Sequence, residues 1–369
     1  MTAGDVARTP AIIGRRQILI TGGAGFIGSN LADRLAREGH DVLVYDALAR
    51  SGVDTNLAWL KKRHPQRVSG VIGDVRDETA VAEASADATA VFHFAAQVAV
   101  TTSLVEPRAD FDVNVRGTLN LLDALRRRRE PVPLLFASTN KVYGDLADVP
   151  LEASNDAYVP RDANVRASGI SEDRCLAFHT PYGCSKGAAD QYVLDYARSF
   201  GVPTCVMRMS CIYGPRQMGT EDQGWVAHFV IRALQGEPIS IYGDGRQVRD
   251  IMDVSDALDA YIAAWRRIDA VRGRAFNLGG GPANAVSLRQ LLRHIESLLG
   301  RPVELSFSDW RAGDQRYYVS DTTRARRDLG LRQAIPWRTG VAALAHWLAD
   351  ARGLDALSEA KLKTAGALT

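Results

Sequence analysis

The sequence predicts an α/β protein with a doubly wound parallel sheet, because short β-branched runs alternate with amphipathic helical patterns over its first half. Consecutive strands in such units run parallel, and the intervening helices cover both faces of the sheet. In addition, the strand patterns end in small or polar residues. Because ligands bind beyond the carboxyl ends of the strands in these sheets, we expect a binding site along that edge.

The individual elements follow in order from the patterns. The run QILITGG (17–23) predicts the first strand, and SNLADRLAREG (29–39) predicts a helix with Leu31, Ala32 and Leu35 on one face and Gly39 at its end. Long helices are expected over residues 107–128 and 181–200. The further strands expected are DVLVYD (41–46), VSGVIGDV (68–75), AVFHFAA (90–96), PLLFAST (133–139) and PTCVMRMS (203–210).

The alternation weakens after Tyr213, which predicts a second, smaller lobe. Segments 214–226 and 305–321 are rich in Gly, Arg, Asp and aromatic residues, with only short helical patterns between them. We expect a sheet domain over residues 17–212, with later returns near 238–280 through ISIYG (239–243) and AFNLGG (275–280). The interleaved substrate lobe would take residues 213–237 and 281–345, with tails at 1–16 and 351–369, the second a loose helix or disordered.

Composition excludes several classes of function. The formal net charge is only +2 over 369 residues, so nucleic acid is not an expected partner. The four cysteines form no C-x-x-C pair and have no clustered histidine, which argues against a disulfide framework and a metal site. No apolar run approaches membrane-spanning length, and the first residues lack a signal-peptide pattern. A soluble, cytoplasmic protein is expected.

The segment TGGAGFIG (21–28) joins the first strand to the first helix and predicts a dinucleotide site, as in a Rossmann-type sheet. It contains Gly23-x-Gly25-x-x-Gly28 and, overlapping it, Gly22-x-x-Gly25-x-x-Gly28. Glycines at this turn let backbone N–H groups approach a pyrophosphate at the helix N-terminus. A glycine triplet alone is weak evidence, but the strand before it and the helix after it strengthen the prediction.

Asp46 ends the second strand, where a carboxylate would accept both ribose hydroxyls of NAD and repel the 2′-phosphate of NADP. A surface turn is the alternative for Asp46, and the nearby Arg50 leaves NADP open. Asp74 could take the adenine amine, although the ends of the third and fourth strands, each taken alone, are more often packing features than ligands. The residues expected to bind NAD are Gly22, Gly25, Phe26, Ile27, Asp46, Asp74, Val75, Ala95, Ala96, Gln97, Tyr182 and Lys186.

The segment TPYGCSK (180–186) predicts a general base. Thr180 is the expected N-cap, and Tyr182 and Lys186, four residues apart, lie on one helical face. Lowering the pKa of a phenol from about 10 to 7 takes roughly 4 kcal/mol. An ammonium at 4–5 Å supplies about that much, so Lys186 together with NAD⁺ could make Tyr182 a working base. An ordinary surface pair is the alternative.

The stretch STNKVYGD (138–145) puts four different polar groups directly after an apolar strand. A surface turn is one explanation, and a row of side chains aimed at a substrate is the other.

These motifs, together with NVRGT (114–118), YGPRQ (213–217) and RDIMDVSDA (249–257), resemble the extended short-chain dehydrogenase/reductase family over residues 17–345. The resemblance implies catalysis by Thr139, Tyr182 and Lys186, and a nucleotide-diphosphate sugar bound by the second lobe. It also implies a homodimer, or a higher homo-oligomer, through the helix 107–128 and the Tyr/Lys helix. The residues expected to contact the sugar nucleotide are Thr139, Asn140, Lys141, Ser210, Gln223, Arg249 and Arg316.

Within that family, sugar 4,6-dehydratases carry an Asp-Glu pair where this chain has Asn140 and Lys141, so dehydration is disfavoured. Several stretches resemble a subgroup that epimerises CDP-hexoses at C2 through transient oxidation by NAD⁺. A UDP-sugar 4-epimerase and a nucleotide-sugar dehydrogenase or decarboxylase are alternatives. A non-catalytic dinucleotide sensor is disfavoured because the three catalytic residues are intact.

Overall fold

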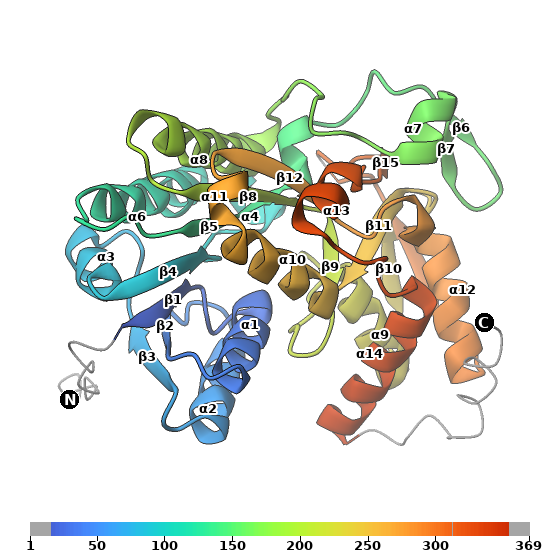
Figure 1. The fold of residues 1–369 in the computed structure, drawn as a ribbon. Coiled ribbons are helices and arrows are strands. Elements are labelled where there is room, and N and C mark those ends of the chain that lie inside the picture. Colours follow the sequence, from blue (N-terminus) through green and yellow to red (C-terminus); the bar gives the residue numbers. More distant parts are fainter. Residues whose placement is uncertain (1–15, 312, 354–369) are drawn as a thin grey trace.

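The computed structural model describes residues 16–311 and 313–353 and confirms the predicted fold (Figure 1). Its central sheet has seven strands in the order β3-β2-β1-β4-β5-β8-β12, and every neighbouring pair is parallel. The order reverses between β1 and β4, which is where doubly wound sheets bind ligands. The strands are β1 (Gln17–Thr21), β2 (Val42–Asp46), β3 (Val68–Ile72), β4 (Ala88–His93), β5 (Leu134–Thr139), β8 (Thr204–Met209) and β12 (Arg274–Leu278).

Two hydrophobic cores lie on opposite faces of this sheet. Alternate residues of β1 enter different cores, because successive side chains of a strand point to opposite faces. Ile18 and Ile20 pack with α1 (Phe26–Arg37), α2 (Val53–Arg63) and α10 (Val254–Arg266). Leu19 packs with α3 (Glu78–Ser85), α6 (Gly117–Arg126) and α8 (Thr180–Ser199). The doubly wound architecture expected from the sequence is therefore present.

The helix expected over residues 107–128 is divided into three parts. It runs through α5 (Pro107–Phe111), a π-helical turn (Asp112–Arg116) and α6. At Gly117 an added Cβ would lie 2.6 Å from Val75, so glycine lets this helix approach the β3 loop closely. Single π-turns within α-helices often accompany functional sites.

The second lobe is built around β11 (Val248–Asp253), which pairs with β9 (Cys211–Tyr213), β13 (Ala285–Ser287) and β15 (Tyr317–Tyr318). Its core is shared by α9 (Trp225–Gln235), α12 (Leu288–Leu299) and α14 (Trp337–Arg352). The shorter elements are α4 (Val100–Val105), β6 (Leu151–Ala153), β7 (Tyr158–Pro160), α7 (Ala163–Ser168), α11 (Ile268–Val271), α13 (Thr323–Leu329), and 3₁₀ turns at Asn140–Tyr143 and Pro282–Asn284.

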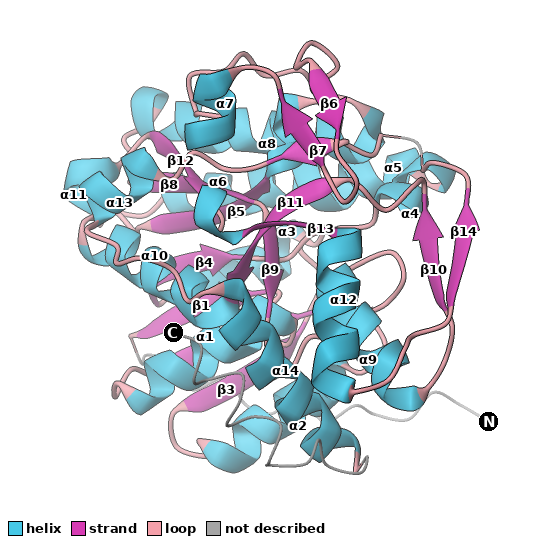
Figure 2. Cartoon of the chain, turned by 90° about the vertical axis from the view of Figure 1, so that its right-hand side faces the viewer, coloured by secondary structure: helices cyan, strands magenta, loops and turns pink. Residues whose placement is uncertain are grey.

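One expected return to the main sheet is wrong. The strand β10 (Ile239–Tyr242) pairs with β14 (Leu305–Ser308) in a separate two-stranded sheet at the rim of the lobe, seen side by side in Figure 2. Only Ile239 and Ile241 of β10 are buried. A strand of the main sheet is covered on both faces, whereas β10 has a single apolar face. The other expected return, β12, does join the sheet.

The predicted tail 351–369 begins at the end of α14, and residues 354–369 and 1–15 lie outside the described part of the chain. Among the described residues, none of the helices combines the length and hydrophobicity needed to span a membrane.

Candidate active site

The glycine-rich loop has the shape needed to receive a pyrophosphate. Gly22 has φ +67°, and an added Cβ there would lie 2.6 Å from the backbone of Ala95. At Gly28 a Cβ would lie 2.4 Å from the carbonyl oxygen of Gly22, so both glycines are required by the protein's own packing. Gly25 differs, because a Cβ there would meet only one atom within 4 Å. The space in front of Gly25, at the N-terminus of α1, therefore suits a ligand.

Asp46 lies beside this loop at the end of β2. Its Oδ2 accepts a hydrogen bond from the N–H of Ala24 at 3.0 Å, and its Oδ1 accepts one from Leu48 at 2.9 Å. The carboxylate is thus fixed next to the glycine-rich loop, where a sheet of this kind places the acid that binds a dinucleotide's ribose, so the residues present fit NAD.

Other residues expected to bind the cofactor are engaged within the protein. Asp74 pairs with Arg76, whose hydrogen bonds hold the pKa of that carboxyl below its ordinary value. The Gln97 side chain donates a hydrogen bond to Asp110 at 3.0 Å, so its amide already has a partner within the protein. Val75 is buried against Gly117. Ala95 contacts Gly22, and for Ala96 no specific contact singles out a role.

A cavity of about 620 Å³ lies between the sheet edge and the second lobe. Nine of the nineteen predicted site residues line it: Phe26, Ile27, Thr139, Asn140, Lys141, Tyr182, Ser210, Gln223 and Arg249. The sequence did not point to other lining residues, among them Met209, Cys211, Tyr242, Arg311 and Asp314. Lys186 and Arg316 do not line this cavity.

The polar residues Ser138 to Lys141, at the end of β5 and the start of the next turn, have partners in the protein interior and also reach the cavity. Ser138 donates a hydrogen bond to Asp190 at 2.7 Å, and Asp190 forms a buried ion pair with Arg208 at 2.9 Å. Ser138 and the next three residues, Thr139, Asn140 and Lys141, all line the cavity. The bond from the Lys141 N–H to the Thr139 hydroxyl, at 3.2 Å, caps the 3₁₀ turn that follows the strand. The surface-turn explanation is therefore wrong.

Tyr182 lies in the first turn of α8. The helix begins at Thr180, and its N-cap is His179 rather than the expected Thr180. Thr180 has φ +64°, and its hydroxyl accepts a hydrogen bond from the N–H of Gly183 at 3.3 Å, so it still stabilises the helix start. Burial raises the pKa of Tyr182 to about 12, although the hydrogen bond with Thr139 acts in the opposite direction.

Lys186 is buried one turn further along α8. Its Nζ donates to the carbonyl oxygen of Ala137 at 2.5 Å and lies 4.2 Å from the centre of the Phe136 ring. Burial lowers its pKa to about 7, while the carboxylates of Asp190 and Asp110 favour the charged form. Burial dominates the pKa of Tyr182, and a lowering of this pKa by Lys186 together with NAD⁺ stays a prediction.

The substrate side of the cavity contains cations that are paired with carboxylates. Arg249 forms an ion pair with Asp314 at 2.6 Å, and the Lys141 Nζ lies 3.8 Å from the same carboxylate. Lys141 also donates to the carbonyl oxygen of Gly313 at 3.0 Å. Arg311 lies over the Tyr242 ring at 3.7 Å. Burial lowers the pKa of Lys141 to about 8, and Arg249 adds to this effect while Asp314 opposes it.

Of the other residues predicted to contact the sugar nucleotide, Asn140 and Ser210 line the cavity, whereas Arg316 lies outside it. The Asn140 amide donates to Gln315 at 2.9 Å, and the Ser210 hydroxyl donates to the Asp250 carboxylate at 2.5 Å. Arg316 lies outside the cavity, with its guanidinium 5.6 Å from the ring centre of Tyr158 and 5.3 Å from that of Trp310.

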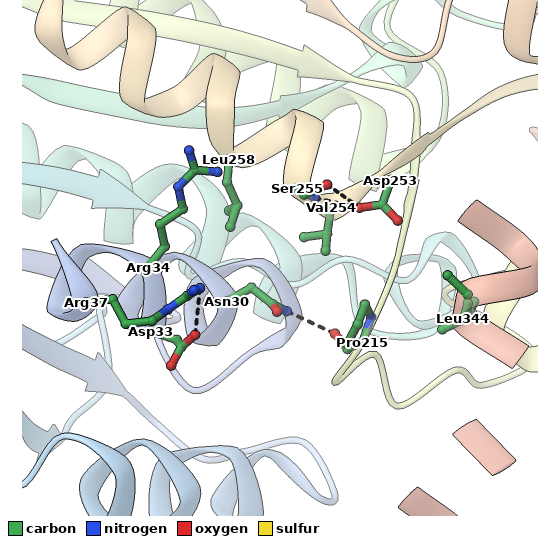
Figure 3. Close-up of a pocket in the computed structure, with 11 residues that line it drawn as sticks. Asn30, Asp33, Arg34, Arg37, Pro215, Asp253, Val254, Ser255, Leu258 and Leu344 are labelled. Carbon is green, nitrogen blue, oxygen red and sulfur yellow. Dashed lines mark hydrogen bonds and ion pairs between the residues drawn. The ribbon is translucent and has the colours of Figure 1, made fainter. Parts of the chain in front are cut away.

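A second, smaller cavity of about 240 Å³ lies between α1, α10 and α14 (Figure 3). Asn30 in this cavity donates to the carbonyl oxygen of Pro215, and Asp33 pairs with Arg37. Its polar side chains are thus used to join helices and loops, and it contains none of the predicted catalytic residues.

Comparisons with known proteins agree with this geometry. The sequence profile of the NAD dependent epimerase/dehydratase family matches residues 18–279. The chain is 39% identical to CDP-paratose 2-epimerase from Salmonella typhi over 338 residues, which is 90% of this chain and 98% of that protein. It is 32% identical to a dTDP-glucose 4,6-dehydratase from Actinoplanes sp., covering 90% and 97% of the two chains. The structure of UDP-glucose 4-epimerase with UDP-glucose from Thermotoga maritima superposes with a TM-score of 0.78 at 29% identity, covering 91% and 99%.

Proposed function

The chain belongs to the NAD dependent epimerase/dehydratase family and uses NAD, and we propose that it epimerises a CDP-hexose at C2 by transient oxidation. The observation that carries the proposal is the joint position of Thr139, Tyr182, Asn140 and Lys141 around one cavity. This set can remove and return a hydroxyl proton, but it has no carboxylate pair directly after Thr139. The choice of CDP and of C2 is supported by the 39% identity to a CDP-paratose 2-epimerase.

In the proposed mechanism, Thr139 and Tyr182 bind the sugar hydroxyl that is oxidised. When bound, NAD⁺ would supply the hydride acceptor and donor and a positive charge that favours the phenolate form of Tyr182. The phenolate takes the hydroxyl proton as the carbonyl forms, and the phenol gives it back when the opposite face of the sugar is reduced. Lys186 would hold the ribose of the dinucleotide, and its ammonium would add to the stabilisation of the phenolate. The Thr139 hydrogen bond already acts in this direction.

Arg249, Arg311 and Lys141 are proposed to bind the diphosphate and its neighbouring sugar. Arg249 and Lys141 share Asp314, and Arg311 lies 3.3 Å from Glu221. A diphosphate would exchange these internal partners for its own oxygens, and such charge-assisted bonds are strong in a desolvated cavity. Asn140 and Lys141 would then orient the sugar where a dehydratase has its acid and base.

Oxidation at C4 of a UDP-sugar is the alternative, because the same proton-transfer groups serve either carbon. Carboxylates do line the cavity, but Asp314 and Glu221 are paired with arginines. They therefore offer little support for the elimination chemistry of a dehydratase.

A homodimer is also proposed, through α4, α5 and α8. Large apolar side chains are exposed on or beside these helices, namely Leu104, Val105, Phe111, Tyr192 and Phe200. Exposed large apolar side chains gathered on neighbouring helices are typical of an interaction surface.

Proton NMR tests the proposed function. The purified protein is mixed in turn with CDP-, UDP-, GDP- and dTDP-hexoses without added NAD⁺. We expect a new diastereomer inverted at C2 with the CDP-sugar and no accumulation of NADH. Inversion at C4 of a UDP-sugar would replace the first proposal by its alternative, and NADH formation that requires added NAD⁺ would show a net dehydrogenase instead.

A further inference from the structure

One loop of the second lobe is attached directly to the two helices that flank the glycine-rich loop. This loop, residues 214–224, connects β9 to α9. The Asn30 amide of α1 donates to the carbonyl oxygen of Pro215 at 2.9 Å. The Asn56 amide of α2 donates to the carbonyl oxygen of Ala24 at 3.1 Å and to that of Arg216 at 3.4 Å. Asn56 is buried, so these bonds lie in the interior of the contact.

The side chain of Arg216 joins loop 214–224 to α2. Its guanidinium carbon lies 3.1 Å from the centre of the Trp59 ring on α2 and 6.0 Å from that of Trp347 on α14. The Arg216 backbone has φ +67°, a left-handed conformation that a non-glycine residue keeps only where its surroundings impose it. The stack on Trp59 and the bond from Asn56 are the contacts that impose it here.

A short chain of hydrogen bonds connects this loop to the carboxylate of Asp46, which we expect to bind the ribose. Asp46 accepts from the N–H of Ala24, the carbonyl of Ala24 accepts from Asn56, and Asn56 also donates to Arg216. At the other side of Asp46, an added Cβ on Gly52 would lie 3.3 Å from Met218 of the same loop. The loop therefore contacts the cofactor domain on both sides of the Asp46 region, while its residues Gln217, Glu221, Asp222 and Gln223 line the substrate cavity.

From this geometry we infer that the stack of Arg216 on Trp59 is a clamp that retains NAD between turnovers. A dinucleotide with its ribose at Asp46 would lie beside the contacts between loop 214–224 and α2, so its release would require the loop to separate from α2. Retention suits a reaction that returns its hydride, because the cofactor is regenerated in place. The inference depends on the NAD site and not on which sugar is epimerised.

The test measures release of dinucleotide without any sugar. Protein loaded with NADH is mixed with a large excess of NAD⁺, and the loss of bound NADH fluorescence gives the dissociation rate. A cation–π contact of this kind is worth enough to change the rate roughly tenfold. Arg216→Met and Trp59→Leu should therefore release NADH about tenfold faster than the wild-type protein, whereas Trp59→Phe, which keeps a ring, should be affected less.

Arg63→Met is the matched control. Arg63 lies 5.8 Å from the same Trp59 ring, but it belongs to α2 itself and bridges no lobes. This variant should release NADH at the wild-type rate. Wild-type release by both Arg216→Met and Trp59→Leu would overturn the inference, and so would equally fast release by Arg63→Met, since that result would assign the effect to α2 alone. Binding stoichiometry of one NADH per chain in each variant confirms that the site still folds.

Discussion

The two ends of the active-site cavity are organised differently. At the catalytic end, Thr139 and Tyr182 come from a regular strand and a regular helix, and burial keeps the Tyr182 pKa at about 12. At the substrate end, Lys141, Arg249 and Asp314 come from segments far apart in the chain and already form ion pairs with one another.

The difference shows what each end requires from its ligand. At the catalytic end, burial raises the pKa of Tyr182, so a nearby positive charge that lowers this pKa would favour proton transfer. The substrate end has its charges compensated internally, so an anionic ligand must compete with Asp314 for Arg249. Substitutions at the catalytic end should therefore affect kcat, whereas substitutions at the substrate end should affect KM.

The largest effect is expected for Tyr182→Phe. Loss of the phenolic oxygen removes the group that carries the proton, so kcat should fall about a thousandfold. NAD content should be unchanged, as measured by absorbance after denaturation. Tyr196→Phe is the matched control, because Tyr196 lies on the same helix and donates to Asp123 at 2.7 Å, away from the cavity. Near-normal turnover of Tyr182→Phe would remove Tyr182 from the mechanism.

The next effect in size is on KM, and we compare the substitution of an arginine that lines the cavity with that of an arginine outside it. Arg249→Met removes a charge-assisted bond to the diphosphate and should raise KM roughly thirtyfold with a smaller change in kcat. Arg316→Met should leave KM within about twofold, because exposed cations far from the ligand are screened. Arg316 was expected from the sequence to bind substrate, so a large KM effect for Arg316→Met would restore that role. Steady-state kinetics on the nucleotide sugar identified by NMR decide between them.

Lys141 adds a pH dependence to the substrate end. Its pKa is lowered from 10.5 to about 8, so the side chain is charged below pH 8 and loses its charge as the pH rises through that value. The plot of kcat/KM against pH should therefore fall above about pH 8. Lys141→Met should lower kcat/KM about tenfold at pH 7 and remove this decline. Lys141→Arg, which stays charged, should also lack the decline. A decline that persists in both variants would belong to another group.

The sequence predicted the catalytic end well because its geometry depends on short spacings within single elements. Four residues separate Tyr182 from Lys186 on α8, and Thr139 ends a strand that hydrophobicity alone reveals. The spacing says nothing of desolvation, so the state of Tyr182 was not predictable. At the substrate end, Asp314 meets Arg249 across 65 residues, and that pairing follows from the packing of the lobe rather than from any local pattern. For the same reason, the sequence predicted a substrate contact for Arg316, which lies outside the cavity, and not for Arg311, which lines it.

The smallest effect is expected for Asp46→Asn, at a position that local spacing also predicted. The substitution keeps a side-chain oxygen for the N–H of Ala24 but removes the negative charge. NAD affinity should weaken only roughly fivefold, and discrimination against NADP should fall by a similar factor, because solvent and salt screen this partly exposed carboxylate. Titration of protein fluorescence with each dinucleotide measures both. If the ratio of NADP to NAD affinity does not change, selection lies with another group, and Arg50→Met is the variant that would then be compared. A changed ratio with unchanged kcat at saturating NAD⁺ would separate cofactor choice from the proton chemistry of Tyr182.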